Sequence, residues 1–280
     1  MDRVTISNSK IHDMAAKFYQ SQAERLLKEY VLEDSFVPTT SVLCGIFACK
    51  MVFNLTQYVT ALHFKSYSGL PKMQIIEWNN RAISTAHAIF ITIMSLYLVF
   101  GSDLYSDNQM DDSIALRSSS LSTSALGVSV GYFLTDLGMI FWFYPSLGGI
   151  EYVIHHIASV TAVAYSMLTG EGQLYTYMVL ISEMTTPAVN LRWYLDVAGL
   201  KRSKAYLING VVIFCTWLVA RILLFVYLFY HVYLHYDQVK GMQSYGLMLV
   251  FGVPAVLGGM NLMWFWKIIR GLRKTIAKRQ

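Results

Sequence analysis

Long apolar runs separated by short polar segments occupy the chain from residue 42 onward. An α-helix needs about 17–25 such residues to cross the hydrocarbon core of a bilayer. We expect seven of these helices, over residues 42–62, 81–100, 121–143, 152–168, 174–195, 206–236 and 244–266. The runs are continuous rather than alternating, which argues against a transmembrane β-barrel. The pattern therefore predicts an all-α fold, a polytopic bundle of transmembrane helices.

Composition supports this interpretation. The chain has 280 residues, of which 55% are hydrophobic and 14% charged, whereas about a quarter of the residues in soluble domains are charged. We therefore expect no separate soluble module. The net charge of +5 does not indicate nucleic acid as a partner, because the basic residues flank apolar runs, as membrane orientation requires. The three cysteines all lie in apolar runs, which favours neither a disulfide framework nor a zinc site.

Basic residues cluster after the first expected span, after the fifth and in the C-terminal tail, while the other loops have few. By the positive-inside rule the C-terminus is cytosolic and the N-terminus lies on the opposite side. Arg25 and Lys28 near the first span oppose this placement, so the side of the N-terminus stays open. Residues 11–32 have apolar positions at helical spacing. They form either an amphipathic helix on the membrane surface or a partly ordered tail.

Several ionisable side chains fall inside the apolar runs. Their positions along the helices place His87, Asp136 and the paired histidines in one layer of the cytosolic half, with Glu183 and Arg221 near mid-bilayer. A charge at such depth costs about 2.5 to 3.5 kcal/mol on translocon scales, so these groups should pair. We expect Asp136 to pair with a histidine, and Glu183 with Arg221 or a histidine.

The fifth expected span carries Glu183, Pro187 and Asn190 on one helical face. Pro187 has no N–H to donate to the carbonyl of Glu183, so we expect an open backbone acceptor beside this carboxylate. Such a break needs protein or a cavity around it. We infer a polar chamber that opens toward the cytosol and is lined by spans two to six. Its residues are His87, Tyr132, Asp136, His155, His156, Glu183, Pro187, Asn190 and Arg221.

Simpler structural roles are open for the same residues. Glu183 could brace a kinked helix, the paired histidines could sit among headgroups, and Arg221 could be a counter-ion. Arg192 is interpreted as an anchor that reaches the interface. The acids and histidines are too scattered to predict a metal site. The chain also lacks the GxSxG, phosphate-loop and Rossmann motifs, so no cofactor is expected.

The order of several short motifs resembles a known family. These motifs are Trp78-Asn79-Asn80-Arg81 leading to His87, Gly131-Tyr132-Phe133-Leu134-Thr135-Asp136, His155-His156, and Glu183-Met184-Thr185-Thr186-Pro187-Ala188-Val189-Asn190-Leu191-Arg192-Trp193. Together they resemble the TLC domain, which ceramide synthases share with the translocating-chain-associating membrane protein. They are most similar to small TLC domain-containing proteins. On this resemblance the chain divides into an N-terminal segment (1–41), a first span and loop (42–69), a TLC domain of six spans (70–272) and a basic cytosolic tail (273–280).

The resemblance implies an endoplasmic reticulum membrane and a role in lipid sensing, homeostasis or transport. Ceramide synthases acylate sphingoid bases from acyl-CoA, and the paired histidines of their motif match His155 and His156. Their motif also contains a His-Asp pair, whereas the corresponding stretch here has Ser182-Glu183. Because acyl transfer to an amine needs a base close to the attacking nitrogen, this departure counts against amide synthesis.

Three hypotheses follow. In the first, the protein senses, binds or regulates a membrane lipid or acyl chain through the polar chamber. In the second, it is an acyltransferase that uses acyl-CoA, with His155, His156 and Glu183 as the catalytic candidates. In the third, it is a trafficking or cargo receptor for membrane proteins. The identity of the lipid and the oligomeric state stay open.

Overall fold

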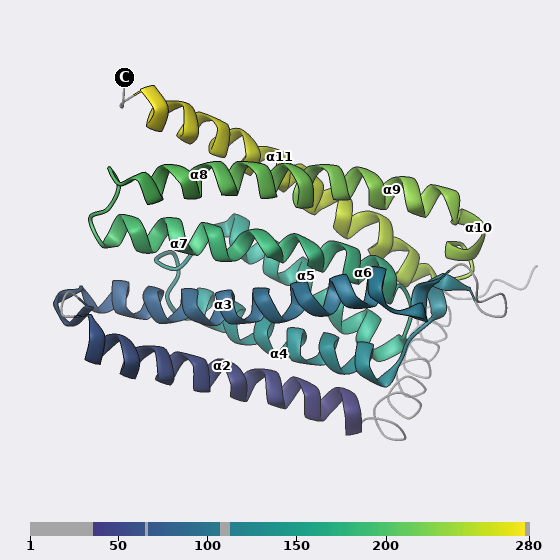
Figure 1. The fold of residues 1–280 in the computed structure, drawn as a ribbon. Coiled ribbons are helices and arrows are strands. Elements are labelled where there is room, and N and C mark those ends of the chain that lie inside the picture. Colours follow the sequence, from purple (N-terminus) through teal and green to yellow (C-terminus); the bar gives the residue numbers. More distant parts are fainter. Residues whose placement is uncertain (1–35, 65–66, 107–112, 278–280) are drawn as a thin grey trace, which may run out of the picture.

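The computed structural model describes residues 36–64, 67–106 and 113–277, and within these ranges the chain forms helices and no strand. The long helices run side by side along the bundle, as Figure 1 shows. This arrangement confirms the expected all-α polytopic bundle. The amphipathic helix considered for residues 11–32 lies outside the described residues.

Most helices begin and end near the bounds expected from the apolar runs. They are α2 (Phe36–His63), α3 (Lys72–Leu96) with a π-helical turn η3 (Tyr97–Gly101), α4 (Ser120–Trp142), α5 (Ile150–Thr169), α6 (Gln173–Leu180), the 3-10 turn η6 (Ile181–Thr185), α7 (Thr186–Val197), α8 (Lys204–Trp217), the π-helical turn η7 (Leu218–Leu223), α9 (Leu224–Leu234), α10 (Tyr236–Val239) and α11 (Ser244–Ala277). Short 3-10 turns at Tyr67–Gly69, Asp103–Tyr105 and Ile114–Leu116 lie in the connections.

Five helical segments among the described residues are long and apolar enough to cross a membrane. They are Phe36–His63, Lys72–Gly101, Ser120–Trp142, Lys204–Leu234 and Ser244–Ala277. These lengths indicate an integral membrane protein. The other two expected spans are α5 and the broken helix made of α6, η6 and α7. Both pack against the long helices, α5 on α4 and α7 on α3 and α8. The total of seven spans stays a prediction.

The bundle turns apolar side chains outward and keeps many polar ones inside. Phe47 and Val226 are each 65% exposed, whereas Asn79 and Asn261 are 0% and 1% exposed. In a soluble protein this distribution would be unfavourable, but in a bilayer the apolar surface faces hydrocarbon and polar groups turn to the protein interior. The fold therefore places the candidate chemistry inside the bundle.

Two spans differ from their expected bounds. α3 begins at Lys72, nine residues before the expected start at Arg81. Pro71 precedes it, and proline is tolerated at a helix start because the first N–H groups have no helical acceptor. α11 continues to Ala277 instead of ending at Trp266, since the Lys, Arg, Ile and Leu residues that follow are good helix formers. The expected start of this span at Arg81 is therefore wrong, and the residue lies inside a helix.

Irregular turns interrupt two spans where the predicted charges lie. In the fifth span, η6 holds Glu183, and Pro187 lies in the first turn of α7. The expected open carbonyl at Glu183 is wrong, because the N–H of Thr186 donates to it. A 3-10 turn pairs residue i with residue i+3, so it supplies the donor that proline removes from the α-helical pattern. In the sixth span, the π-helical turn η7 holds Arg221.

Glycines allow α2 to pack directly on α4. A Cβ atom at Gly45 would lie 2.4 Å from the carbonyl oxygen of Val128, and one at Gly131 would lie 2.3 Å from that of Val42. Neither distance leaves room for a side chain. Small residues of this kind let membrane helices approach at backbone distance, where van der Waals packing is strongest. The first span is therefore an integral part of the bundle.

Candidate functional site

A central cavity of about 490 Å³ lies between α3, α4, α5, α7, η7 and α11, at the end where α4 connects to α5. The predicted chamber residues that line it are Tyr132, Asp136, His155, His156, Glu183, Asn190 and Arg221. Further polar lining residues are Glu77, Asn80, Arg81, Ser84, Thr185, Arg192 and Lys267. The chamber was expected between spans two and six only, but Trp264 and Lys267 of α11 also line it.

Two predicted chamber residues, His87 and Pro187, do not line the central cavity. His87 is buried and stacks on Tyr132, with ring centroids 3.8 Å apart. Its Nε2 lies 3.1 Å from the hydroxyl of Ser129, which itself donates to the carbonyl of Ala125. His87 supports the cavity wall at Tyr132 rather than facing the cavity.

His156 and Asp136 form the pair expected from their depth. Nε2 of His156 lies 2.6 Å from a carboxylate oxygen of Asp136, and both side chains are buried. Nδ1 of His156 lies 2.9 Å from the carbonyl of Tyr152, which can only accept, so Nδ1 is protonated. The short contact to Asp136 then requires a second proton, carried either by Nε2 or by the carboxyl group. His156 and Asp136 thus hold one shared proton inside the bundle.

The neighbouring ring of His155 has a different environment. Its Nδ1 is buried and has no hydrogen-bond partner among the described residues. The ring meets Trp264 edge to face, with centroids 5.8 Å apart, and lines the central cavity. The two histidines therefore cannot do the same chemistry. His156 is occupied by protein partners, while His155 presents a ring to the cavity.

Glu183 and Arg221 form the second expected pair. Their closest oxygen and nitrogen atoms are 3.5 Å apart, and both side chains are buried. Arg221 also donates to the hydroxyl of Thr185 at 2.8 Å and to the amide oxygen of Asn261 at 3.3 Å. The guanidinium thus ties η7 to both η6 and α11. This linkage explains how two irregular turns can face each other inside a membrane bundle, since their polar groups have partners.

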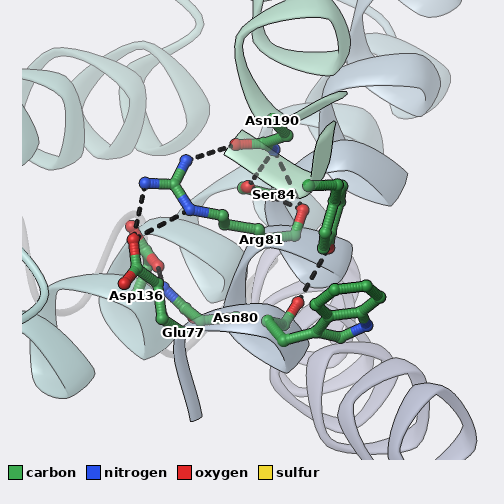
Figure 2. A network of polar contacts seen from close by, with 8 residues as sticks. Glu77, Asn80, Arg81, Ser84, Asp136 and Asn190 are labelled. Carbon is green, nitrogen blue, oxygen red and sulfur yellow. Dashed lines mark hydrogen bonds and ion pairs between the residues drawn. The ribbon is translucent and has the colours of Figure 1, made fainter. Parts of the chain in front are cut away.

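A network around Arg81 is the main feature that sequence reasoning missed. Figure 2 shows Arg81 between Glu77 and Asn190. Two of its nitrogens donate to Glu77, at 3.0 and 2.7 Å, and a third donates to Asn190 at 3.0 Å. Asn190 in turn donates to the carbonyl of Arg81 and to the hydroxyls of Ser84 and Thr85. This network joins α3 to α7 at the side of the cavity.

One signal could have revealed this network. Glu77, Asn80, Arg81 and Ser84 follow one another at i, i+3, i+4 and i+7, which is one face of a helix. The side chain of Asn80 donates to Asp136 at 2.8 Å and so connects α3 to the histidine pair. The sequence pattern does not reveal this face when the span is taken to begin at Arg81, because Glu77 and Asn80 then fall outside the helix.

Two cations in the wall of the central cavity, Arg192 and Lys267, have no carboxylate partner among the described residues. Arg192 lies over the ring of Tyr206, 4.0 Å from its centroid, and Lys267 projects from α11. The other lining cations, Arg81 and Arg221, have Glu77 and Glu183 as partners. The part of the cavity wall at Arg192 and Lys267, the basic end, therefore carries excess positive charge. Arg192, interpreted from sequence as an interface anchor, is also a wall of this cavity.

Two further cavities continue inward from the central one. A deep pocket of about 20 Å³ shares Phe133, His155, Glu183 and Arg221 with it. A far cavity of about 40 Å³ shares Ser159, Val179, Leu180 and Leu257 with the deep pocket. The far cavity is lined mostly by apolar side chains of α5, α6 and α11. The three cavities thus lie in a row, from a basic end through a polar middle to an apolar end.

The family model of the TLC domain matches residues 77–270. The chain belongs to this family. Among curated relatives, TLC domain-containing protein 4-B of Xenopus laevis is 30% identical over 76% of this chain and 80% of its own length. TLC domain-containing protein 4 of Homo sapiens is 27% identical over 85% of this chain and 90% of its own length. TLC domain-containing protein 4-B of Danio rerio is 25% identical over 84% of this chain and 89% of its own length. No solved structure matches.

The match confirms the resemblance read from the motifs. All residues that line the three cavities fall within the matched TLC domain, from Glu77 to Ile268. α2 lies outside it, although this helix packs closely on α4 of the TLC domain. The division of the chain at residues 41, 69 and 272 stays a prediction. The TLC domain by itself therefore supplies the candidate site, and α2 supports it from outside.

Proposed function

We propose that the protein binds a single-chain amphiphilic lipid, in the service of lipid sensing or homeostasis. The observation that carries this proposal is the row of three cavities with its gradient from cations to apolar side chains. A lipid would place its polar head at the basic end, near Arg192 and Lys267. Its middle would meet the layer of His155, Glu183 and Arg221, and its chain would extend toward the far cavity.

The electrostatics of the site support an amphiphile rather than a simple apolar ligand. Glu183 and Asp136 are buried, and each is held by a partner from another helix. Keeping such groups at membrane depth costs free energy, so they commonly mark binding or transport pathways. An apolar ligand would leave the polar wall of the central cavity without hydrogen-bond partners, whereas a lipid head group supplies them.

Mass spectrometry of the purified, folded chain tests the proposal. We expect a single-chain lipid to co-purify with the wild type. Val189→Trp fills the central cavity without breaking an ion pair, so it should lose the lipid and keep the fold. Asp196→Ala removes an exposed carboxylate paired with Lys201 outside the cavity and should keep the lipid. Folded wild-type protein that is free of lipid would count against the proposal.

A second function, acyl transfer from acyl-CoA to an amine or alcohol, is favoured by one observation. His155 presents a ring to the central cavity with a buried, unpartnered nitrogen, which is what a general base or nucleophile requires. An assay with acyl-CoA and candidate acceptors decides between lipid binding alone and turnover. Activity that survives in the double variant His155→Ala, His156→Ala would remove the paired histidines from the mechanism.

We also propose that the protein resides in the endoplasmic reticulum with its C-terminus in the cytosol. The loop around Lys201 and the C-terminal part of α11 lie at the same end of the bundle, and Arg192 and Lys267 of the basic end belong to the helices that reach this end. By the positive-inside rule this end faces the cytosol. Protease protection of a C-terminal tag in sealed microsomes tests the orientation, since a cytosolic tag is digested without detergent.

A further inference from the structure

Asn261 on α11 is a buried polar residue in which one of the two polar atoms of the side-chain amide has a hydrogen-bond partner. It is 1% exposed, and its amide oxygen accepts from Arg221 at 3.3 Å. A guanidinium only donates, so this contact fixes which side of the amide faces Arg221. The amide nitrogen, Nδ2, has no hydrogen-bond partner among the described residues.

The unpartnered amide belongs to a wall of the deep pocket. Asn261 lines this pocket together with His155, Glu183 and Arg221. The pocket, at about 20 Å³, holds about one small polar group. Native structures seldom leave a buried donor without an acceptor, because the lost hydrogen bond to water is not replaced. The deep pocket is therefore built to receive an acceptor.

The neighbours of the pocket decide what kind of acceptor fits. Arg221 and Asn261 both present donors, and a ligand ammonium would be repelled by the guanidinium beside it. The carboxylate of Glu183 already accepts from Thr186 at 2.8 Å and pairs with Arg221. A group that only accepts hydrogen bonds, such as a carbonyl oxygen, complements this set of donors better than a hydroxyl or an amine.

We propose that Asn261 recognises the acyl carbonyl of the bound lipid, with Nδ2 donating to the carbonyl oxygen in the deep pocket. This inference rests on the proposed lipid-binding function and names the ligand class as an acyl lipid rather than an alkyl ether, alcohol or sterol. The position of the pocket agrees with it. The deep pocket lies between the polar central cavity and the apolar far cavity, where the carbonyl of an acyl lipid joins its head group to its chain.

Two single-chain lipids that differ only in this carbonyl test the inference. The probes are 1-palmitoyl lysophosphatidylcholine and its 1-O-hexadecyl ether analogue. Binding is measured as displacement of a fluorescent single-chain lipid from the full-length chain in phosphatidylcholine nanodiscs. One neutral hydrogen bond should make the ester bind about three- to tenfold more tightly than the ether. The wild type alone gives this comparison, so the test does not depend on whether a variant folds.

Two matched variants locate the effect. Asn261→Asp keeps the oxygen that faces Arg221 and replaces the Nδ2 donor by an acceptor, so the preference for the ester should disappear. Asn79→Asp is the control. Asn79 is also fully buried, its oxygen accepts from Tyr67 at 3.0 Å, its Nδ2 is also unpartnered, and it does not line the cavities. This control should keep the preference of the wild type.

The outcomes separate this inference from the proposed function. Equal binding of ester and ether by the wild type overturns the role of Asn261 and leaves lipid binding intact, with water as the acceptor in the deep pocket. A preference that persists in folded Asn261→Asp also overturns it. Failure of the wild type to bind either lipid overturns the proposed function itself.

Discussion

The seam between α2 and α4 and the interior between α3, α5, α7 and α11 hold the same bundle together in opposite ways. At the seam, Gly45 and Gly131 bring two backbones into contact and leave no space. In the interior, charged and amide side chains from separate helices meet across a cavity of about 490 Å³. The seam is held by close van der Waals packing of the two backbones, and the interior is held by hydrogen bonds and ion pairs.

The difference teaches how a membrane bundle can be tight and hollow at once. Helices in a bilayer gain little from apolar burial, because lipid tails are as apolar as the side chains. Close packing at the seam and polar pairing in the interior both replace that missing driving force. Of the two, only polar pairing leaves room for a ligand, since the long paired side chains hold the helices apart.

Breaking the buried ion pair should have the largest effect. Arg221→Met leaves Glu183 buried without its cation, and the loss of stability should be about 3–5 kcal/mol. The measurement is unfolding of the purified protein in detergent, by denaturant or heat. The combined variant Glu183→Leu, Arg221→Met removes both charges and should recover most of this stability while the bound lipid is lost. A double variant as unstable as the single one would mean that packing, rather than charge, holds η6 to η7.

A methyl group at the seam should have the next largest effect. Gly131→Ala places a Cβ atom 2.3 Å from the carbonyl of Val42, so α2 must shift, at a cost of about 1–3 kcal/mol. Gly138→Ala on the same helix is the control, because nothing lies within 4 Å of its added Cβ. The control should be neutral or more stable, since alanine favours helix. Similar unfolding of both variants would contradict a backbone contact at the seam.

Trimming the Arg81 network should have a smaller effect. Ser84→Ala removes one acceptor of the Asn190 amide, while the carbonyl of Arg81 and the hydroxyl of Thr85 remain. The amide has two hydrogens, and these two remaining acceptors satisfy both, so we expect a loss of about 0.5 kcal/mol, at the low end of the net contribution of one hydrogen bond. A clearly larger loss would show that Ser84 has a further role at the cavity wall. The same unfolding measurement applies.

The exposed pair of Lys201 and Asp196 should have the smallest effect. Its atoms are 2.8 Å apart, but both side chains are open to solvent. Water screens such pairs, so Lys201→Ala should leave the thermal midpoint unchanged. A clear shift of the midpoint would mean that the loop between α7 and α8 contributes more to the fold than its exposure indicates.

Depth along the expected helices was enough to predict the two buried ion pairs. The expectation that Asp136 pairs with a histidine, and Glu183 with Arg221 or a histidine, is confirmed, and the structure selects His156 and Arg221 as the partners. An isolated buried charge is unfavourable in a bilayer, so each charge needs a partner. Because few ionisable residues lie at the same depth, the choice of partner is small. The same reasoning could not assign roles within the histidine pair, because that assignment depends on the carbonyl of Tyr152.

Three features were not predicted, and each depends on a contact or a local turn that hydropathy does not show. Arg81 marks the expected start of a span because the stretch before it is polar, although partners on α7 and within α3 make it part of a helix that begins earlier. Asn261 was overlooked because a lone amide in a long apolar run gives no periodic signal. The carbonyl of Glu183 was expected to be open because the sequence marks the proline but not the 3-10 turn that compensates for it.

The sequence by itself determined that the chain is a helical membrane bundle, approximately where its long apolar helices lie, and that its buried charges need partners. These properties follow from hydropathy and from the cost of burying charge, both of which act locally along one helix. Only the tertiary structure decided that η6 faces η7, that α11 completes the cavity wall and that the cavities lie in a row. These depend on contacts between helices distant in sequence, which hydropathy along one helix does not encode.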